Sequence, residues 1–459
     1  MSKIQKIAFF CAFLICHCIA LQAIAHASPE DKDVKAEGEG ADSKAEGESA
    51  DKAEGESADK AEGGGADKAE GESADKAQVE QSEDKQAEGE RAGDGQAKDK
   101  TAEGEGAEDK KAKDKQKEEV GLGVTPFGAV AYSQETSVLF GAAAILFYHF
   151  PEARKRRDWQ LGLTAAYTLK NQITALIFSE IYLMQNRIRI DSTLSASYFP
   201  DSFFGLGNAT DFADREAYNP LYAELSVRPR YRVISKLFVG PALRLRYAEI
   251  RTTTAGGFLE AGDIIGSNGG MLSQLGVSAV YDARDNILYP YRGSEINFDF
   301  LWGESAWGSD FSNTLTRVNA KFYFPTFFDK HVLAVQGLAE FRTGTVPFFD
   351  LGLLGGDQLV RGFFQGRYRD NHMVVAQVEY RMPVWWKFGS TFFAGIGEVA
   401  NQVKDFKIGE FKYSMGFGIR FSPSKKAPVN IRLDFAWGVN KDGFISAAPQ
   451  FYINLGEAF

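Results

Sequence analysis

The residues best placed for chemistry are arginines spaced two apart in otherwise apolar stretches. Arg228, Arg230 and Arg232 form one row, and Arg244 and Arg246 form a second. Guanidinium groups stay protonated in proteins, so such rows either favour anions in a pore or pair with carboxylates across an interior. Nearby carboxylates include Glu224, Asp282 and Asp299. Both interpretations, an anion pathway and internal ion pairs, are open at this point.

Catalytic and metal-binding constellations do not occur in the sequence. The histidines beyond the amino-terminal region, His149, His331 and His372, lie far apart, whereas a zinc site needs at least three converging ligands. No Gly-x-Ser-x-Gly elbow is found, and Gly395-x-Gly397 falls in a predicted strand rather than at the start of a helix. The formal net charge is −10. We therefore expect no enzymatic activity, no cofactor, no metal and no nucleic-acid partner.

The chain begins with the features of a secretory signal peptide. Lys3 and Lys6 precede an apolar stretch over 7–24, and this ends in the small-x-small sequence Ala25-His26-Ala27. The three cysteines of the chain all lie inside this segment: Cys11, Cys16 and Cys18. Residues 1–27 are therefore predicted to be cleaved near Ala27, which leaves an exported chain without disulfides or thiols.

Residues 28–119 form an acidic repeat tract. Variants of Ala-Glu-Gly-Glu-Ser-Ala-Asp-Lys recur, most clearly at 45–52 and 53–60, and the tract contains no aromatic residue. Such a composition cannot bury enough apolar surface to offset the entropy of ordering, so we expect disorder. A spacer, for example across a peptidoglycan layer, and a neutral repeat expansion are both compatible with it.

Residues 120–459 show the alternation of membrane-spanning β-strands. Between 428 and 437 the apolar residues occupy every second position, with Arg432 and Asp434 on the opposite face. Such runs extend over about ten residues, the length that crosses a bilayer at a tilt, whereas soluble strands average five or six. Charged residues on one face suit a wet lumen, and aromatic pairs such as Trp385-Trp386 at segment ends suit the membrane interfaces.

The pattern predicts an all-β fold, a 16-stranded antiparallel transmembrane β-barrel. The expected strands are 126–133, 137–149, 158–169, 172–184, 186–199, 221–234, 235–249, 272–284, 292–303, 310–324, 329–343, 372–385, 388–400, 410–422, 428–439 and 444–459. The longest connections, about 200–220, 250–271 and 344–371, all follow odd-numbered strands. Long loops at one end and short turns at the other are typical of outer-membrane barrels.

The last predicted strand closes on Phe459, and this aromatic terminus is similar to the signature by which assembly machinery recognises barrel substrates. Tyr452, Gly456 and Phe459 are the candidate residues of this terminal signal. They also belong to an expected seam between the first strand and the last, which Gly456 could weaken.

Several motifs resemble the outer-membrane insertase superfamily, typified by BamA and TamA, whose barrel is also called the bacterial surface antigen domain. The most specific is Gln358-Leu359-Val360-Arg361-Gly362-Phe363, which looks like the motif at the tip of the long sixth external loop. Other matching stretches are Asp282 to Asn286, Val378 to Pro383 and Gly416 to Phe421. The resemblance covers roughly 120–459.

The resemblance assigns a role to Arg361. In family members the loop arginine pairs with a glutamate, which matches Glu379 here, and with an aspartate on the next strand. Glu379 also lies on the predicted lumen face, because Val378 and Tyr380 occupy the other. Gly395 stands where the aspartate would align, so one partner is expected to be missing and the loop to be held less firmly.

Besides Gly395, a second difference from the superfamily pattern concerns the periplasmic POTRA modules that precede such barrels. These small α/β domains need a hydrophobic core, and residues 28–119 have no residues to build one. The chain therefore resembles a POTRA-less relative, which puts client capture by such modules in doubt.

The resemblance implies an integral protein of a Gram-negative outer membrane that assists protein or lipid insertion or translocation. Its implied partners are outer-membrane lipids, client outer-membrane proteins and the barrel assembly machinery. Two other functions remain open: a passive pore, and a structural barrel that displays its external loops.

Overall fold

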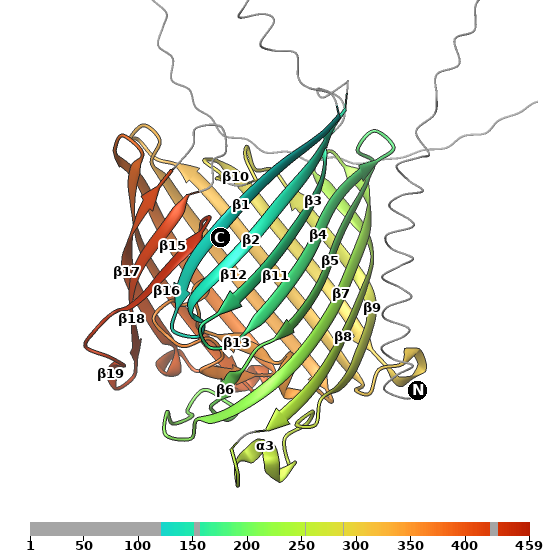
Figure 1. Cartoon of the computed structure of the whole chain (residues 1–459), viewed down its shortest axis with the longest axis vertical. Helices are drawn as coiled ribbons and strands as arrows, with labels where there is room; N and C mark the ends of the chain where they lie inside the picture. Colours follow the sequence, from blue (N-terminus) through green and yellow to red (C-terminus); the bar gives the residue numbers. More distant parts are fainter. Residues whose placement is uncertain (1–120, 151–156, 253, 288, 423–429) are drawn as a thin grey trace, which may run out of the picture. The chain divides into compact units, whose positions relative to one another are not determined.

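The computed structural model describes residues 121–150, 157–252, 254–287, 289–422 and 430–459. Their main feature is a single antiparallel sheet of eighteen strands, closed into a barrel by pairing of β1 with β20. Two of these strands, β6 (Asp201–Phe203) and β19 (Gly443–Phe444), are short extensions. The other sixteen form the wall, which confirms the predicted fold (Figure 1). The expectations for residues 1–27 and 28–119 lie outside the described residues.

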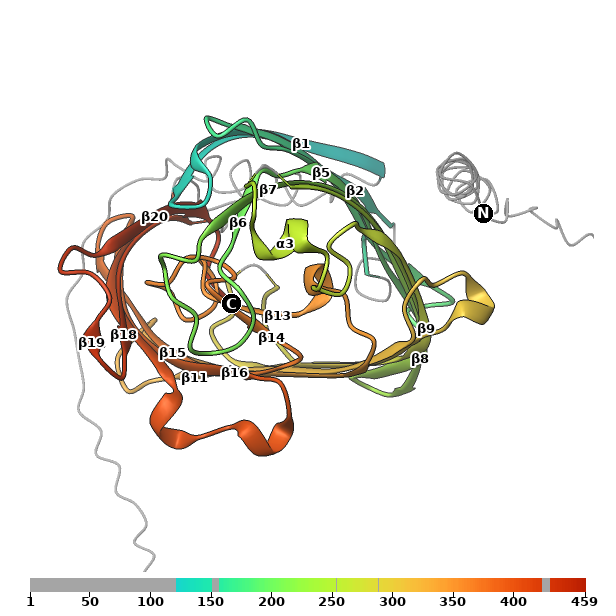
Figure 2. The same ribbon diagram turned by 90° about the horizontal axis from the view of Figure 1, so that it is seen from below.

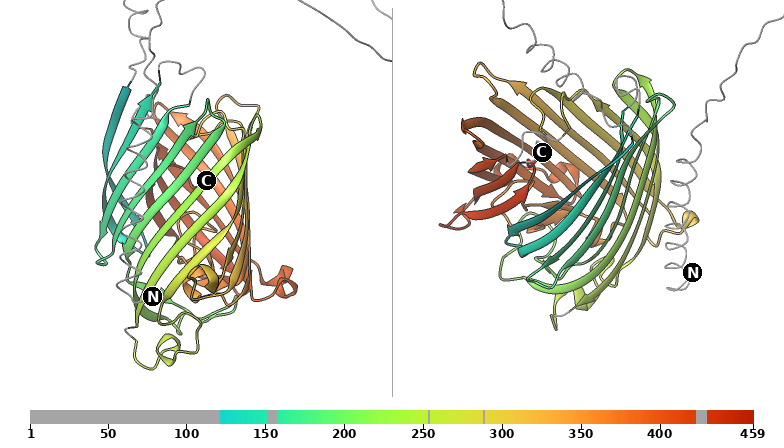
Figure 3. Two further views of the ribbon diagram at one scale, coloured as in Figure 1. Left: turned by 90° about the vertical axis from the view of Figure 1, so that its right-hand side faces the viewer. Right: turned by 45° about the horizontal axis from the view of Figure 1, so that its top comes forward.

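The wall strands follow one another around the barrel in chain order, each antiparallel to its neighbours. Their bounds are β1 Gly121–Ser133, β2 Ser137–His149, β3 Trp159–Thr168, β4 Ile173–Leu183, β5 Ile188–Tyr198, β7 Glu216–Ile234, β8 Leu237–Thr252, β9 Gly270–Asp282, β10 Gly293–Gly303, β11 Asn313–Pro325, β12 Val332–Gly344, β15 His372–Trp385, β16 Phe388–Ala400, β17 Lys412–Phe421, β18 Ile431–Asn440 and β20 Gln450–Leu455. Figure 3 shows their common tilt.

Alternation along each strand separates an apolar outer face from a polar inner face. In β18, Ile431 is partly exposed while Arg432 and Asp434 are buried. In β17, Tyr413 and Met415 point outward. The buried set of the barrel is rich in charged residues and the exposed set is rich in large apolar ones, which is the reverse of a water-soluble protein and suits a wall against lipid.

The long connections gather at one end of the barrel (Figure 1). They carry β6, the helix α3 (Phe258–Ala261), the hairpin of β13 (Gly352–Leu354) with β14 (Tyr368–Asp370), and β19. Four short 3-10 helices lie in the same set of connections: η1 Ser305–Trp307, η2 Phe348–Asp350, η3 Val403–Asp405 and η4 Ile408–Glu410. The opposite end has short turns, such as 235–236 between β7 and β8.

Three of these connections meet in a hydrophobic cluster at the loop end. Its buried members come from β6, β7, β8, α3 and the segment around η2: Phe203, Tyr218, Ala248, Ile250, Leu259, Val346, Phe348, Phe349 and Leu351. Figure 2, viewed along the barrel, shows β6, β13, β14 and α3 inside the ring of wall strands. The loops therefore form a packed core of their own over the lumen.

Two further findings concern the wall. None of the helices in the described part of the chain is long and apolar enough to cross a membrane. The predicted last strand, 444–459, is too long: the chain forms β19, then a loop, and then β20, which ends at Leu455. Gly456 has a φ of 80°, a left-handed conformation that turns the chain out of the wall.

Candidate functional site

The candidate site is built around loop six, the connection 345–371 between β12 and β15. Its tip is buried in a hydrophobic cluster with residues of β12, β15 and β16, whose members are Leu338, Leu354, Val360, Phe363, Tyr368, Met373, Val375 and Val399. Val360 and Phe363 have no exposed surface. Loop six is therefore folded into the lumen and held there by apolar burial on both sides of Arg361.

The tip has an unusual backbone. Val360 has a φ of 47°, a left-handed conformation that is a genuine outlier for a β-branched residue and costs on the order of 1–3 kcal/mol. Gly362 has a φ of 108°, and a Cβ there would lie 2.5 Å from the backbone nitrogen of Gly438 in β18. Only glycine allows this approach, so Gly362 places the loop backbone directly against β18.

Arg361 is gripped by two carboxylates and an aromatic ring. One terminal nitrogen lies 2.5 Å from Oε1 of Glu379 in β15, and the other lies 2.6 Å from Oδ2 of Asp434 in β18. The guanidinium carbon stands 3.5 Å from the ring centroid of Phe393 in β16. Both carboxylates are fully buried. Removal of one partner from such a buried pair leaves an uncompensated charge, which typically costs about 3–5 kcal/mol.

The expectation that Arg361 has a single carboxylate partner is wrong. Gly395 does stand on β16 without a carboxylate, but a Cβ built on it would lie 3.6 Å from the Cα of Val360. The loop backbone uses this space, and the second carboxylate comes from Asp434, two strands further along the wall. Asp434 belongs to the polar face of β18. The alternation of apolar and polar residues along this strand is the sequence signal that could have placed Asp434 in the lumen.

The pair extends into a larger charge network. Arg381 lies 2.8 Å from the other oxygen of Glu379, and Arg420 lies 2.6 Å from Asp434 and 2.7 Å from Glu457. Each arginine thus has a carboxylate beside it, and the network joins β15, β17, β18 and the segment after β20 to loop six. Because the charges alternate, the position of the loop tip depends on all these strands together.

Four of the five arginines in the two rows, Arg228, Arg230, Arg244 and Arg246, form ion pairs with carboxylates. Arg244 lies 2.8 Å from Asp350 in loop six and 3.1 Å from Glu224. The other pairs of the rows are Arg228 with Asp299, Arg230 with Asp191, and Arg246 with Glu224. Asp282 pairs instead with Arg284 at 3.0 Å. Asp350, which the sequence did not single out, therefore ties the base of loop six to β8.

The seam between β1 and β20 is the weakest junction of the wall. β1 pairs with β2 along its whole length, from Gly121 to Ser133. Between β1 and β20, the described residues share one register pair, Tyr132 with Ile453. The rings of Tyr132 and Phe451 also stack there, with centroids 4.2 Å apart. Figure 2 shows β20 beside the turn that joins β1 to β2. Residues 121–131 of β1 therefore have no register partner on β20.

The terminal candidates Tyr452, Gly456 and Phe459 do not share one environment. Tyr452 is buried on the lumen face of β20, packed with Phe393 and Ala436. Gly456 ends the strand. Phe459, which was expected to close an alternating strand, is instead buried against Tyr323, Val332 and Ala334, and its main-chain oxygen accepts a hydrogen bond from Arg381 at 2.7 Å.

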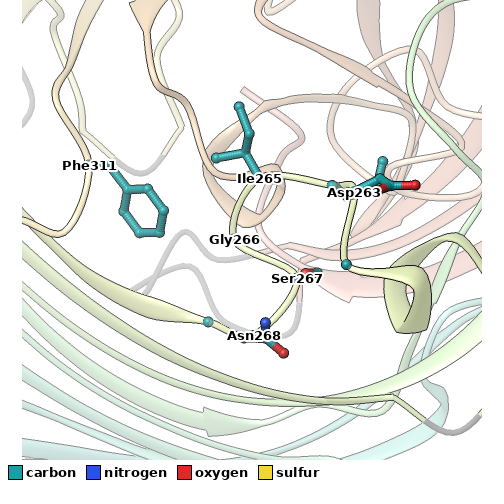
Figure 4. Close-up of a pocket in the computed structure, with 9 residues that line it drawn as sticks. Asp263, Ile265, Gly266, Ser267, Asn268 and Phe311 are labelled. Atoms are coloured by element: carbon teal, nitrogen blue, oxygen red, sulfur yellow. The ribbon is translucent and has the colours of Figure 1, made fainter.

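Cavities and metal ligands add little to this site. A pocket of about 280 Å³ lies in the β8–β9 connection and is lined by residues 262–269 and Phe311 (Figure 4). In the part of the chain that the structure describes, no three histidine, cysteine or carboxylate residues gather as metal ligands. Nδ1 of His149 lies 2.7 Å from the carboxylate of Asp158, and Nδ1 of His331 lies 2.7 Å from the hydroxyl of Tyr380.

Comparison with known proteins gives a family and a set of similar folds. A model described as the Omp85 superfamily domain matches residues 157–459. The structure is similar to BamA from Haemophilus ducreyi lacking POTRA domains 1–3, with 16% identity and a TM-score of 0.49, over 74% of this chain and 71% of that one. No curated protein matches the chain.

The chain is also similar to two CdiB structures, of which it spans less than two thirds. CdiB from Acinetobacter baumannii matches at 11% identity and a TM-score of 0.47, over 73% of this chain and 60% of that chain. CdiB from Escherichia coli matches at 12% identity and a TM-score of 0.47, over 72% and 62%.

Proposed function

Because the chain belongs to the Omp85 superfamily, we propose that this outer-membrane barrel assists insertion or translocation of protein or lipid through the seam between β1 and β20. The observation that carries the proposal is the single register pair, Tyr132 with Ile453, that joins the two strands. Every other wall junction has a longer ladder, and the shortest of them, between β18 and β20, has six pairs.

The free edge of β1 has unpaired backbone amide and carbonyl groups with which an incoming strand can form hydrogen bonds. Unpaired amide and carbonyl groups in hydrocarbon cost several kcal/mol each, so residues 121–131 present an edge with a strong tendency to pair. A client hairpin that adds to this edge satisfies its own backbone groups and those of β1 at once. The seam thereby lowers the cost of bringing a polar backbone into the membrane.

Loop six supports this function over a passive pore. The loop lies in the lumen, anchored by Arg361 to Glu379 and Asp434, and the connections above it form a packed hydrophobic cluster. Arg228, Arg230, Arg244 and Arg246, four of the five arginines that could attract anions, have carboxylate partners, which reduces their positive potential. A pore would need this loop to leave the lumen.

Reconstitution with two readouts tests the proposal. The purified chain is placed in liposomes, and folding of an added unfolded outer-membrane barrel is followed beside conductance in planar bilayers. An assembly factor accelerates folding of the added barrel and passes little steady current. A passive pore gives steady current, increased by Arg361→Ala, and a surface-display barrel gives neither effect.

A pair of disulfide traps links that activity to the seam. Tyr132→Cys with Ile453→Cys locks β1 to β20, whereas Leu433→Cys with Ile453→Cys joins β18 to β20 at a register pair inside the wall. Both traps share one substitution, and both sites suit the short Cα separation that a disulfide needs. The seam trap should abolish the acceleration until it is reduced. Undiminished activity of the oxidised seam trap would count against the proposal.

Export and partners complete the proposal. We propose that residues 1–27 are removed near Ala27, and mass spectrometry of the protein purified from outer membranes would then give a chain that begins at Ser28. Outer-membrane lipids, client barrels and the assembly machinery are the proposed partners, and the tract 28–119 is a proposed spacer.

A further inference from the structure

Loop six contacts the last strand through its tip. The backbone amide of Gly362 donates a hydrogen bond to the hydroxyl of Tyr452 in β20 at 3.1 Å. The side-chain amide of Asn454, also in β20, donates to Asp357 at 2.8 Å. Two residues on the lumen face of β20 are thus bonded to the segment 357–362.

The same tip contacts the first hairpin of the barrel. Glu135 lies in the turn between β1 and β2, is 5% exposed, and accepts a hydrogen bond from the backbone amide of Gln365 at 2.7 Å. Gly362 and Gln365 are three residues apart, so one short stretch of loop six contacts β20 on one side of the seam and the turn after β1 on the other.

The contacts made by loop six lie on the lumen side of the wall, opposite the direct contact between β1 and β20. Tyr132 and Phe451 stack on the outer face, because Leu122, Val124 and Val130 share that face of β1 and are exposed. Tyr452 and Glu135 are buried. The seam is therefore held from the lipid side by one ring pair and from the lumen side by loop six.

We propose that the segment 357–365 of loop six is a clasp that keeps the seam closed, with Glu135 and Tyr452 as the positioning residues to which it is fastened. This proposal rests on the proposed function in that the seam is the working part of the barrel. The Glu135 contact joins the clasp to the first hairpin, while β20 has two bonds to the clasp and a ladder to β18. Loss of Glu135 therefore frees the β1 side, and β20 stays in place.

Disulfide trapping measures seam closure directly, without an activity assay. The full chain carries serine at Cys11, Cys16 and Cys18, together with Tyr132→Cys and Ile453→Cys, and the initial rate of disulfide formation in liposomes follows the fraction of time that the seam is closed. Glu135→Ala removes a hydrogen bond to a buried carboxylate and should slow trapping about tenfold.

The second position makes the test sharper. Tyr452→Phe removes the hydroxyl that accepts from Gly362 and should also slow trapping, by less than Glu135→Ala because Asn454 still holds Asp357. The clasp links β20 to the first hairpin only while both contacts are made, so loss of the Glu135 contact alone already breaks the link. The double variant should therefore trap no more slowly than Glu135→Ala alone. If the double variant slows trapping by the product of the two single effects, the proposal of a clasp is wrong.

Two control variants separate the clasp from a general loss of packing. Glu135→Gln keeps an oxygen acceptor for the Gln365 amide and should trap at close to the parent rate. Glu216→Ala breaks a contact of the same kind that involves neither segment 357–365 nor the strands of the seam, because this carboxylate, 5% exposed, accepts from the amides of Phe258 and Leu259. Slower trapping in Glu216→Ala equal to that in Glu135→Ala would overturn the proposal.

Insertion assays on the same preparations distinguish failure of the clasp proposal from failure of the proposed function. If trapping slows as expected but no variant or parent accelerates folding of an added barrel, the clasp stands and the proposed function fails. If the parent accelerates folding and neither Glu135→Ala nor Tyr452→Phe alters trapping, the proposed function stands and the clasp is wrong.

Discussion

The backbone of Val360 fills the space beside Gly395 that a side chain would need. A Cβ built on Gly395 lies 3.6 Å from the Cα of Val360 and 2.9 Å from the hydroxyl of Ser414. The left-handed Val360 therefore rests on a glycine of β16, and this close approach brings Arg361 within reach of Asp434. The loop tip therefore lies directly against this part of the wall, at ordinary contact distance from a Cβ at Gly395.

Gly395→Asp should displace the tip of loop six. The carboxylate needs the volume that Val360 occupies, so the loop should become accessible to added protease in the folded barrel. Gly409→Asp is the control, because Gly409 is exposed and a Cβ there meets no atom within 4 Å. Undiminished protection of the Gly395→Asp variant would show that loop six does not need the space beside Gly395.

Arg361→Ala should destabilise the barrel by about 3–5 kcal/mol, because it leaves Glu379 and Asp434 buried with one cation fewer. Urea unfolding followed by tryptophan fluorescence measures this as a lower midpoint at an unchanged slope. Arg251→Ala removes an exposed arginine paired with Glu249 and should cost at most about 1 kcal/mol. Equal losses in the two variants would contradict a special role for the buried pair.

Tyr132→Ala should loosen the lipid side of the seam. Stacked aromatic pairs contribute about 0.5–1.5 kcal/mol beyond their burial, so amide hydrogen exchange in β20 should accelerate roughly threefold to tenfold. Phe322→Ala breaks a stack with Phe324 within β11, a strand that pairs with neither β1 nor β20, and should leave exchange at the seam unchanged. Acceleration confined to the Phe322→Ala variant would show that the Tyr132–Phe451 stack does not stabilise the seam.

Phe459→Ala should lower stability by about 3 kcal/mol, because a buried ring is removed from the cluster with Tyr323 and Val332. The main-chain oxygen that Arg381 contacts is retained, so the effect reports loss of the ring, including its contact with the guanidinium carbon of Arg381, 5.4 Å from the ring centroid. Unfolding in urea gives the measurement, and Phe328→Ala, on an exposed turn residue, is the reference. A terminal residue that acts only as an assembly signal would leave the unfolding midpoint where it is.

The contribution of Glu135 should depend on pH. Burial raises the pKa of its carboxyl and the charge of Asp357 adds to this, whereas hydrogen bonds from Gln365 and Ser133 oppose the increase without cancelling it. The folded state therefore binds the proton more tightly than the unfolded state. This stabilisation is full below the unfolded pKa and is lost as pH rises through the raised folded value.

Glu135→Gln cannot ionise, so its melting temperature relative to the parent should rise as pH increases from about 4 toward neutrality. Thermal unfolding by circular dichroism across that range is the measurement. A constant difference between the two proteins at all pH values would show that Glu135 has no raised pKa.

The sequence predicts the barrel well because its strands are specified locally. Alternation over about ten residues, as in β17 and β18, depends only on which face meets lipid, and a shift by one residue would place arginines such as Arg432 in hydrocarbon. Strand number, strand order and the end that carries the long loops follow from the same pattern. The family resemblance on the motif around Arg361 is confirmed by the match over 157–459.

Contacts within the site are less accessible to sequence reasoning. Arg361 and Glu379 are 18 residues apart and their faces can be assigned, whereas Asp434 is 73 residues from Arg361 and is one of several acids on lumen faces. Which acid the loop reaches depends on how deeply the loop descends. Gly362 limits that depth, because a Cβ there would lie 2.5 Å from the backbone nitrogen of Gly438, a contact that exists only once the opposing strand is in place.

The sequence by itself therefore determined the closed sheet, its polar interior and the loop that carries Arg361. Successive residues of a barrel strand face lipid and lumen in turn, so apolar and polar residues must alternate along the sequence. Only the tertiary structure decided that Asp434 completes the grip on Arg361, that Phe459 leaves the wall for the lumen, and that one residue pair joins β1 to β20. These are relations between segments far apart in the chain, and their geometry arises from barrel closure rather than from any local pattern.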